Sequence, residues 1–278
     1  MRQEWRWLPL ITLIPSLYAL GWLSVQPLHL VLQTIPKEKL SLLGTLISFL
    51  IFVFILPSWI KIRWGQSRPW QSVGLISLHA RETPLSSFVL IKGLAWACAL
   101  LLLILIPLIL GSWAQVLRSL SLPEAINAVL LGLGVGIVEE LIFRGWLWEE
   151  LKRLVSSKSA VIIQAAIFSL VHTRFNLGLW SMTGLLIGLF LFGVALALRR
   201  NLDQGSLWGS IGLHGGLVGG WFALQAGLIQ LSPNAPIWLV GPGGISPNPL
   251  GGAIAIIALA VLIYRQLLIN KSLADRST

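Results

Sequence analysis

The stretch GLGVGIVEELIFRGWLW, from Gly132 to Trp148, places two glutamates and an arginine inside an apolar segment of helical character. Insertion measurements charge roughly 2.5–3.5 kcal/mol for one Asp, Lys or Arg at the middle of a membrane-spanning helix. Glu139, Glu140 and Arg144 lie within six residues, so neighbouring groups must compensate a larger cost. The stretch is therefore predicted to cross a membrane and to carry the functional site.

The composition predicts that most of the chain lies in lipid. Of 278 residues, 56% are hydrophobic and only 11% are charged, whereas soluble domains carry roughly 25% charged residues. Apolar runs recur at about the 20 residues that a spanning helix needs. We predict an all-α polytopic membrane protein, a bundle of about eight transmembrane helices at 8–33, 40–60, 88–111, 124–148, 159–175, 177–198, 206–230 and 250–269.

The net charge of +10 is interpreted as a topology signal, and no nucleic-acid partner is expected. With the N-terminus in the cytoplasm, most Lys and Arg residues fall in cytoplasmic segments, as the positive-inside rule requires. Both termini are then cytoplasmic. The first apolar run exceeds the roughly 7–15 residues of a signal-peptide core, so it is predicted to be a span. We expect a bacterial inner membrane, with an organellar membrane as the alternative.

Three parts are predicted along the chain. Residues 1–120 form three N-terminal spans, 121–232 form a catalytic core of spans four to seven, and 233–278 hold an outer loop and the last span. Glycines four residues apart predict close helix packing in spans four, six and seven. These glycines are Gly132, Gly136, Gly184, Gly188, Gly212, Gly216 and Gly220.

Two further features are given structural interpretations. Cys98, the only cysteine, is expected to be a buried packing residue of the third span. Glu149 and Glu150 adjoin Lys152 and Arg153, so a solvated helix end is expected there.

The polar residues of the spans are predicted to meet near mid-membrane. Glu140 and Arg144 have the favourable i,i+4 spacing for an ion pair, which leaves Glu139 free to act as a base. His172 and His214 lie in two other spans. At 1.5 Å per residue, Glu139 and His214 are roughly 12–14 Å from the cytoplasmic ends of their spans, and His172 roughly 20 Å. A cavity opening to the cytoplasm is expected.

These residue types permit several functions. Two histidines and a glutamate suit a catalytic zinc ion, although no His-Glu-x-x-His motif is present. Intramembrane Glu and His also mark proton relays of transporters, but the chain has no inverted-repeat symmetry. A structural role, or a non-catalytic scaffold that binds a partner, is the remaining alternative.

The motifs resemble those of the CAAX-protease and bacteriocin-processing family (CPBP, or abortive-infection family), which includes type II CAAX prenyl endopeptidases. The likeness covers roughly residues 124–230. The family's first motif, Glu-Glu-x-x-x-Arg, is matched in full, as is the second, Phe-x-x-x-His; the third, His-x-x-x-Asn or Asp, is matched only at its histidine. The matching residues are Glu139, Glu140, Arg144, Phe168, His172 and His214.

The chain departs from the third motif at Val218, which stands where the family has Asn or Asp. If that amide binds the oxyanion, its loss costs about 10²–10³ in rate. Trp221 and Gln225 follow on roughly the same helix face, so either is a possible substitute. Without a substitute, a slow enzyme or a scaffold is expected.

The resemblance implies an intramembrane endopeptidase that uses no cofactor. Glu139 would take a proton from water, His172 would position that water, and His214 would donate to the oxyanion. Arg144 would hold Glu140 ionised. The partners implied are the lipid bilayer and a peptide or protein substrate, lipidated or not. In the zinc alternative, the metal ligands are Glu139, His172 and His214.

Overall fold

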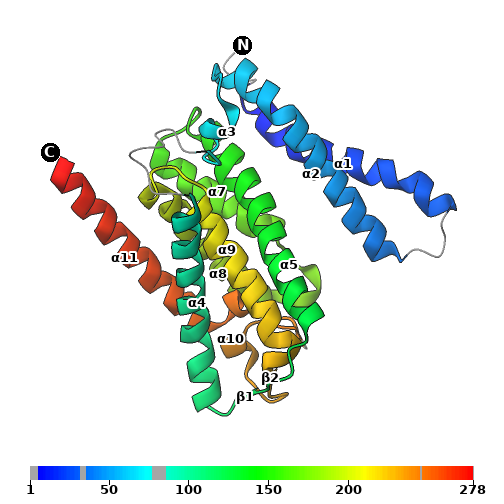
Figure 1. Cartoon of the computed structure of the whole chain (residues 1–278), viewed down its shortest axis with the longest axis vertical. Coiled ribbons are helices and arrows are strands. Elements are labelled where there is room, and N and C mark those ends of the chain that lie inside the picture. The colour runs from blue at the N-terminus through cyan, green and yellow to red at the C-terminus, as the bar shows by residue number, and fades with distance from the viewer. Residues whose placement is uncertain (1–5, 32–35, 77–85, 245, 278) are drawn as a thin grey trace. The chain divides into compact units, whose positions relative to one another are not determined.

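The computed structural model describes residues 6–31, 36–76, 86–244 and 246–277. Contacts divide the chain into two compact units, Met1–Ser72 and Val73–Thr278. In the first unit, two long helices pack side by side as an antiparallel hairpin, in blue in Figure 1. Its elements are α1 (Leu8–Val31), α2 (Lys37–Trp59), the π-helix η2 (Ile60–Trp64) and α3 (Pro69–Ser72).

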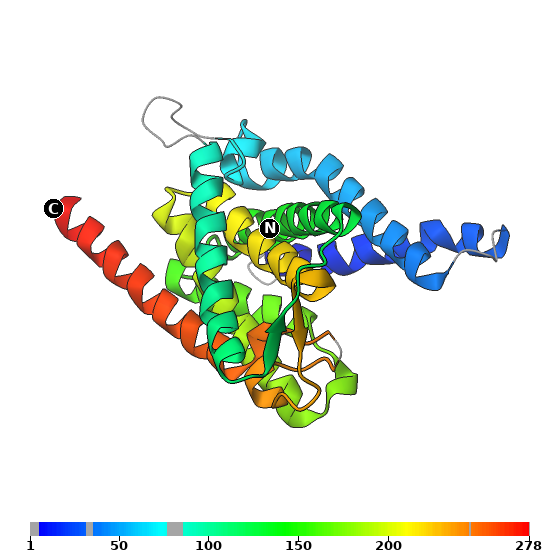
Figure 2. The ribbon, with the colours of Figure 1, turned by 60° about the horizontal axis from the view of Figure 1, so that its bottom comes forward.

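The second unit is a helical bundle built around α9. Helices α4 and α5 pack along α9, and α8 packs against α7 and α11 (Figures 1 and 2). The helices are α4 (Ser86–Leu110), α5 (Leu122–Glu140), η3 (Leu141–Leu147), α6 (Trp148–Leu151), α7 (Ser157–Val171), η4 (Phe175–Leu177), α8 (Leu179–Leu202), α9 (Trp208–Ala223), η5 (Leu224–Leu228), α10 (Ile237–Val240), η6 (Pro249–Gly251) and α11 (Ala253–Ser277). Strands β1 (Ala114–Val116) and β2 (Ile229–Leu231) pair antiparallel.

The prediction of an all-α polytopic membrane protein is confirmed. In the described part of the chain, each of the eight predicted ranges contains a helix, although the range 206–230 ends in strand β2, and six helices are long and apolar enough to cross a membrane. The other two helices are shorter: α7 has 15 residues and α9 has 16. The predicted functional boundaries at residues 120 and 232 remain predictions.

Glycines hold α5 against α9, as their spacing predicts. A Cβ atom on Gly132 would lie 2.5 Å from the carbonyl oxygen of Gly215, and one on Gly136 would lie 2.9 Å from that of Ile211. Such distances are too short for any side chain, so the two backbones approach closely. This packing places the C-terminal end of α5 beside the middle of α9.

We expect Gly132→Ala to lower the free energy of unfolding by about 1–3 kcal/mol, because the new methyl group overpacks a backbone contact. Gly134→Ala is the matched control, since no atom lies within 4 Å of its Cβ position in the described part of the chain. That substitution should stabilise α5 by about 1 kcal/mol. Unfolding in mixed micelles measures both; equal effects would contradict close α5–α9 packing.

Two expectations about burial are wrong. Cys98 is exposed, and it lines a cavity that α4 shares with α5 and α9. Glu150 is fully buried, although a solvated helix end was expected. Glu149 contacts Lys152 at 2.8 Å as expected, and it also pairs with Arg200 at 3.1 Å. The packing of α6 against α7, together with the ion pair between Glu149 and Arg200 of α8, therefore buries this helix end.

Candidate functional site

The first motif lies where an α-helix changes into a π-helix. Helix α5 begins with a capping box in which Ser121 and Glu124 bond each other's backbone N–H groups. It ends at Glu140, and the π-helix η3 follows directly. Single π turns inside helices often occur at functional sites, because they reorient side chains and leave backbone groups available for other partners. Arg144 lies inside this π segment.

One carboxylate oxygen of Glu140 joins two helices. Arg144 Nη1 donates to Glu140 Oε1 at 2.8 Å, and His214 Nδ1 lies 2.8 Å from the same oxygen. The Glu140 and Arg144 side chains are completely buried. The predicted ion pair is thus present, whereas the bond to His214 was not predicted. Because a carboxylate accepts, His214 Nδ1 carries a proton and its Nε2 faces away from Glu140.

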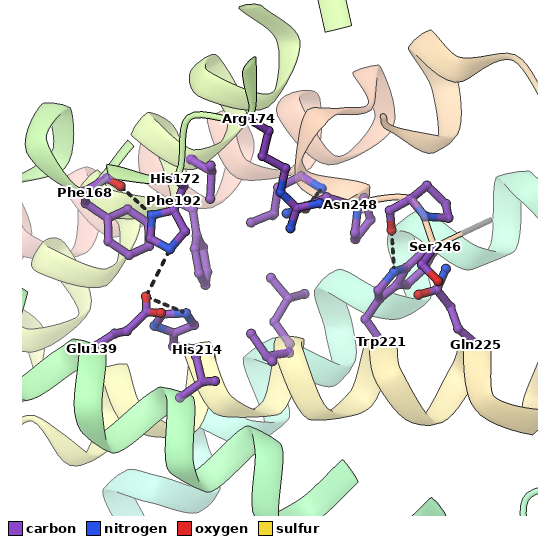
Figure 3. A pocket seen from close by; sticks show the side chains of 17 residues that line it. Glu139, Phe168, His172, Arg174, Phe192, His214, Trp221, Gln225, Ser246 and Asn248 are labelled. Atoms are coloured by element: carbon purple, nitrogen blue, oxygen red, sulfur yellow. Dashed lines mark hydrogen bonds and ion pairs between the residues drawn. The ribbon is translucent and has the colours of Figure 1, made fainter. Parts of the chain in front are cut away.

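Glu139, His172 and His214 lie together, as predicted. Figure 3 shows both imidazole rings turned toward Glu139. Nε2 of His172 is 3.5 Å from Glu139 Oε2, and Nε2 of His214 is 3.8 Å from it. Nδ1 of His172 lies 2.7 Å from the Phe168 carbonyl oxygen, which can only accept, so that nitrogen carries a proton. His172 caps the end of α7, which sets its depth.

Aromatic rings surround the three polar side chains. Phe168 lies under the Arg144 guanidinium at 4.2 Å and meets the His214 ring edge-on at 5.8 Å. Phe192 of α8 packs edge-on against His214 at 5.2 Å. The second motif predicted that Phe168 belongs to the site, whereas no pattern in the sequence distinguished Phe192 from the other apolar residues of α8. Both rings keep His214 in one orientation.

A second polar cluster supports the π-helix and was missed. Arg200 of α8 donates to the backbone oxygen of Arg144, donates to Gly205 O at 3.0 Å, and pairs with Glu149. Its neighbour Arg199 forms a two-point ion pair with Asp203. The sequence analysis counted both arginines among the basic residues that set the membrane topology, yet both side chains are buried. The i,i+4 spacing of Arg199 and Asp203 was the available signal.

These residues form one end of a pocket of about 240 Å³. Val218 lines the pocket, so the motif's missing amide corresponds to an apolar wall. Trp221 also lines it, but its indole N–H donates to Pro247 O at 2.8 Å. Its only polar donor is occupied, so Trp221 does not replace the amide and that expectation is wrong. Gln225 also lines the pocket, so its role remains a prediction.

The pocket runs away from the helix ends that carry most basic residues. From Glu139 it follows α9 toward its C-terminal end and reaches the segment 246–250. Its exposed lining residues, Arg174 and Ser246, lie at that far end. A second cavity of about 550 Å³ shares Gln225 and Pro247 with it. The exposed part of the lining therefore lies away from the basic helix ends, and the expected opening to the cytoplasm remains a prediction.

Within the described ranges, no group of three or more His, Cys, Asp or Glu side chains has an arrangement that could hold a metal ion. The donor types facing Glu139 Oε2 are nevertheless those of a zinc site, and each histidine has its other nitrogen fixed by an acceptor, as in zinc sites. The zinc ligand set therefore remains a prediction.

Two family profiles match the chain. Residues 1–68 match a domain of unknown function (DUF8676), and residues 120–219 match the type II CAAX prenyl endopeptidase Rce1-like family. A search of the curated proteins found no match. The second range contains all three motif segments, including Val218. The match over residues 120–219 supports the resemblance to the CAAX-protease family that the motifs indicated.

Proposed function

We propose that this protein is an intramembrane endopeptidase in which Glu139 activates the water that hydrolyses a peptide bond. The match of residues 120–219 to a protease family implies a peptide or protein substrate. The observation that carries the proposal is that both histidine Nε2 atoms face Glu139 Oε2 inside one pocket. That oxygen has no hydrogen-bond partner among the described residues, and Glu139 lines the pocket, so the carboxylate is able to bind a water molecule there.

The proposed reaction begins with a water held by Glu139 and His172. Because His172 Nδ1 keeps its proton on the Phe168 carbonyl, its Nε2 accepts a hydrogen bond from water. Glu139 takes the other proton as the water oxygen attacks the peptide carbonyl carbon. Glu139 then gives that proton to the leaving nitrogen, and the carbon–nitrogen bond breaks. Two products result, one with a new carboxyl group and one with a new amino group.

His214 is proposed to stabilise the oxyanion. To donate from Nε2 while Nδ1 donates to Glu140, it must be an imidazolium. Glu140 accepts the hydrogen bond from His214 Nδ1, and Arg144 pairs with Glu140 in turn. In this account Glu140 and Arg144 position His214, and neither takes part in proton transfer.

Restoring the amide of the third motif should increase the rate. Val218 is half-buried in the pocket wall, one turn after His214, and Asn has a similar volume. We expect Val218→Asn to raise kcat by about tenfold or more, because one oxyanion donor contributes about 10²–10³. Steady-state cleavage measures this, with Val218→Leu as control. Equal kcat for both variants would contradict an oxyanion at this position.

The proposal is tested with purified protein in nanodiscs and an unbiased peptide library, including lipidated peptides, read by mass spectrometry. New termini are expected with wild type. Silence from folded protein would favour the scaffold alternative, which the apolar Val218 supports. Cleavage lost on chelation and restored by zinc would instead identify a zinc protease, which the fixed Nδ1 atoms of both histidines favour.

We also propose a bacterial inner membrane with both termini in the cytoplasm. The support is that the long helices α4, α8 and α11 carry basic residues at the ends assigned to the cytoplasm. A reporter enzyme that is active only outside the cytoplasm, fused to the C-terminus, should be inactive. Activity of the reporter would show that the C-terminus lies outside the cytoplasm, which contradicts the proposed topology.

A further inference from the structure

The position of His172 in the site depends on the position of α7. His172 caps the C-terminal end of this helix, and its ring is fixed to the same helix because Nδ1 lies 2.7 Å from the Phe168 carbonyl oxygen. Glu139 belongs to α5 instead. The 3.5 Å between His172 Nε2 and Glu139 Oε2 is therefore set by how far α7 lies along the bundle.

Apolar packing alone does not fix α7 along its own axis. In a bilayer, apolar side chains gain little from contacting a helix rather than lipid tails, so helix association depends on close backbone packing and interhelical hydrogen bonds. The 15 residues of α7 make it about 22 Å long, less than the roughly 30 Å hydrocarbon core. The two membrane surfaces therefore cannot both fix its depth.

Two buried polar side chains of α7 bond the backbone of α8. Gln164 Nε2 donates to the Gly193 carbonyl oxygen at 3.1 Å, and Ser169 Oγ donates to that of Leu186 at 2.7 Å. Gln164 is completely buried, and Ser169 is 4% exposed. Moving forward along α7 from one bond to the other corresponds to moving back along α8, so both bonds belong to one antiparallel register.

The α8 side of this contact is also tied to the first motif. A Cβ atom on Gly193 would lie 3.0 Å from Ala165 Cβ, so the two helices approach closely beside the Gln164 bond. The Gly193 carbonyl oxygen also lies 3.5 Å from Arg144 Nη2 and accepts from it. One carbonyl of α8 thus receives both Gln164 of α7 and the arginine that pairs with Glu140.

We propose that Gln164 and Ser169 form a register clamp, which holds α7 at the depth where His172 meets Glu139. The effect of the clamp on rate rests on the proposed peptidase function. Neither residue lines the pocket, so both are positioning residues. With one bond removed, the other still holds the register. With both removed, α7 can slide by up to one turn, about 5.4 Å, and carry His172 away from Glu139.

The first measurement reads the register itself, by electron paramagnetic resonance on the full-length protein in nanodiscs. Spin labels are attached at Lys158→Cys and Thr183→Cys, two exposed positions, in a Cys98→Ser background. In the register of the two bonds, these positions are about 22 Å apart along the helix axes. Gln164→Met/Ser169→Val should shift or broaden this distance by several ångströms, up to about 5.4 Å.

Gln164→Met/Ser169→Thr is the matched control, because threonine has nearly the volume of valine but keeps the hydroxyl donor. It should retain the wild-type distance. A wild-type distance in the valine double variant overturns the proposal, whether or not the protein cleaves peptides.

The second measurement is steady-state cleavage. In the valine double variant, kcat should fall about 10²-fold with KM within about twofold, because a displacement of about 1 Å already costs this much in rate. Most of the pocket lining belongs to α8, α9 and the segment 246–250, which supports an unchanged KM. The threonine double variant should recover kcat to within about threefold, the contribution of one interhelical hydrogen bond.

Gln266→Met controls for the loss of a buried glutamine. Gln266 is 3% exposed in α11, which also packs against α8, but it does not line the pocket. Its replacement should leave kcat unchanged. Equal kcat in the valine and threonine double variants, or an equal loss in Gln266→Met, overturns the proposal. A register that shifts as expected in a protein that cleaves no peptide would leave the clamp standing and reject the peptidase.

Discussion

Replacing Glu139 by glutamine is expected to lower kcat/KM for peptide cleavage by about 10²–10⁴-fold, the contribution of a positioned general base. Glutamine keeps the shape of the side chain and can still contact His172, but it cannot accept the proton of water. The protein should remain folded, because Glu139 is partly exposed and does not take part in the buried Glu140–Arg144 pair. Steady-state cleavage and thermal unfolding measure the two properties.

Glu124→Gln is the control for loss of one carboxylate from the same helix. Glu124 belongs to the capping box at the start of α5 and does not line the pocket. Its replacement should cost about 1 kcal/mol of stability and leave kcat/KM unchanged. If Glu139→Gln retained wild-type kcat/KM, another group would have to be the base.

The largest effect on stability is expected from Arg144→Met. Both members of the Glu140–Arg144 pair are fully buried, so removing the cation leaves a buried carboxylate with His214 as its remaining partner. Breaking a buried pair in this way costs about 3–5 kcal/mol. The free energy of unfolding in mixed micelles, measured for wild type and variant, gives the value directly.

The double variant Glu140→Gln/Arg144→Met identifies the cause. It removes both charges, and the glutamine carbonyl can still accept from His214 Nδ1. We expect it to be more stable than Arg144→Met alone, because no buried carboxylate is left without its arginine. A double variant that loses the sum of the two single losses would show that packing, not charge, sets the cost.

The sequence predicted those parts of the site that follow from the free-energy cost of charges in lipid and from the periodicity of a helix. Charges inside apolar runs are few, so Glu139, His172 and His214 stood out and were expected to meet. Glu140 and Arg144 are four residues apart, and their pair needed only a helix. The glycine spacing likewise identified the α5–α9 contact. Each of these predictions depends on one helix or on the scarcity of polar groups in lipid.

What sequence missed depends on how separate helices pack. The bond between His214 and Glu140 joins residues 74 positions apart. The hydrogen bond from Arg200 to the Arg144 backbone oxygen involves the π-helix, and no periodicity in the sequence predicted a π-helix there. The direction of the pocket depends on where the segment before η6 folds back, at Pro247. A depth estimate along straight helices contains none of this information.

The most direct test of the account is peptide cleavage in water enriched in ¹⁸O, with wild type and Glu139→Gln compared in nanodiscs. Mass spectrometry then reads both the position of each cut and the origin of the new carboxyl oxygen. The account predicts new C-termini that carry one ¹⁸O atom, formed by wild type and not by Glu139→Gln. Equal cleavage by both proteins, or none by folded wild type, would contradict it.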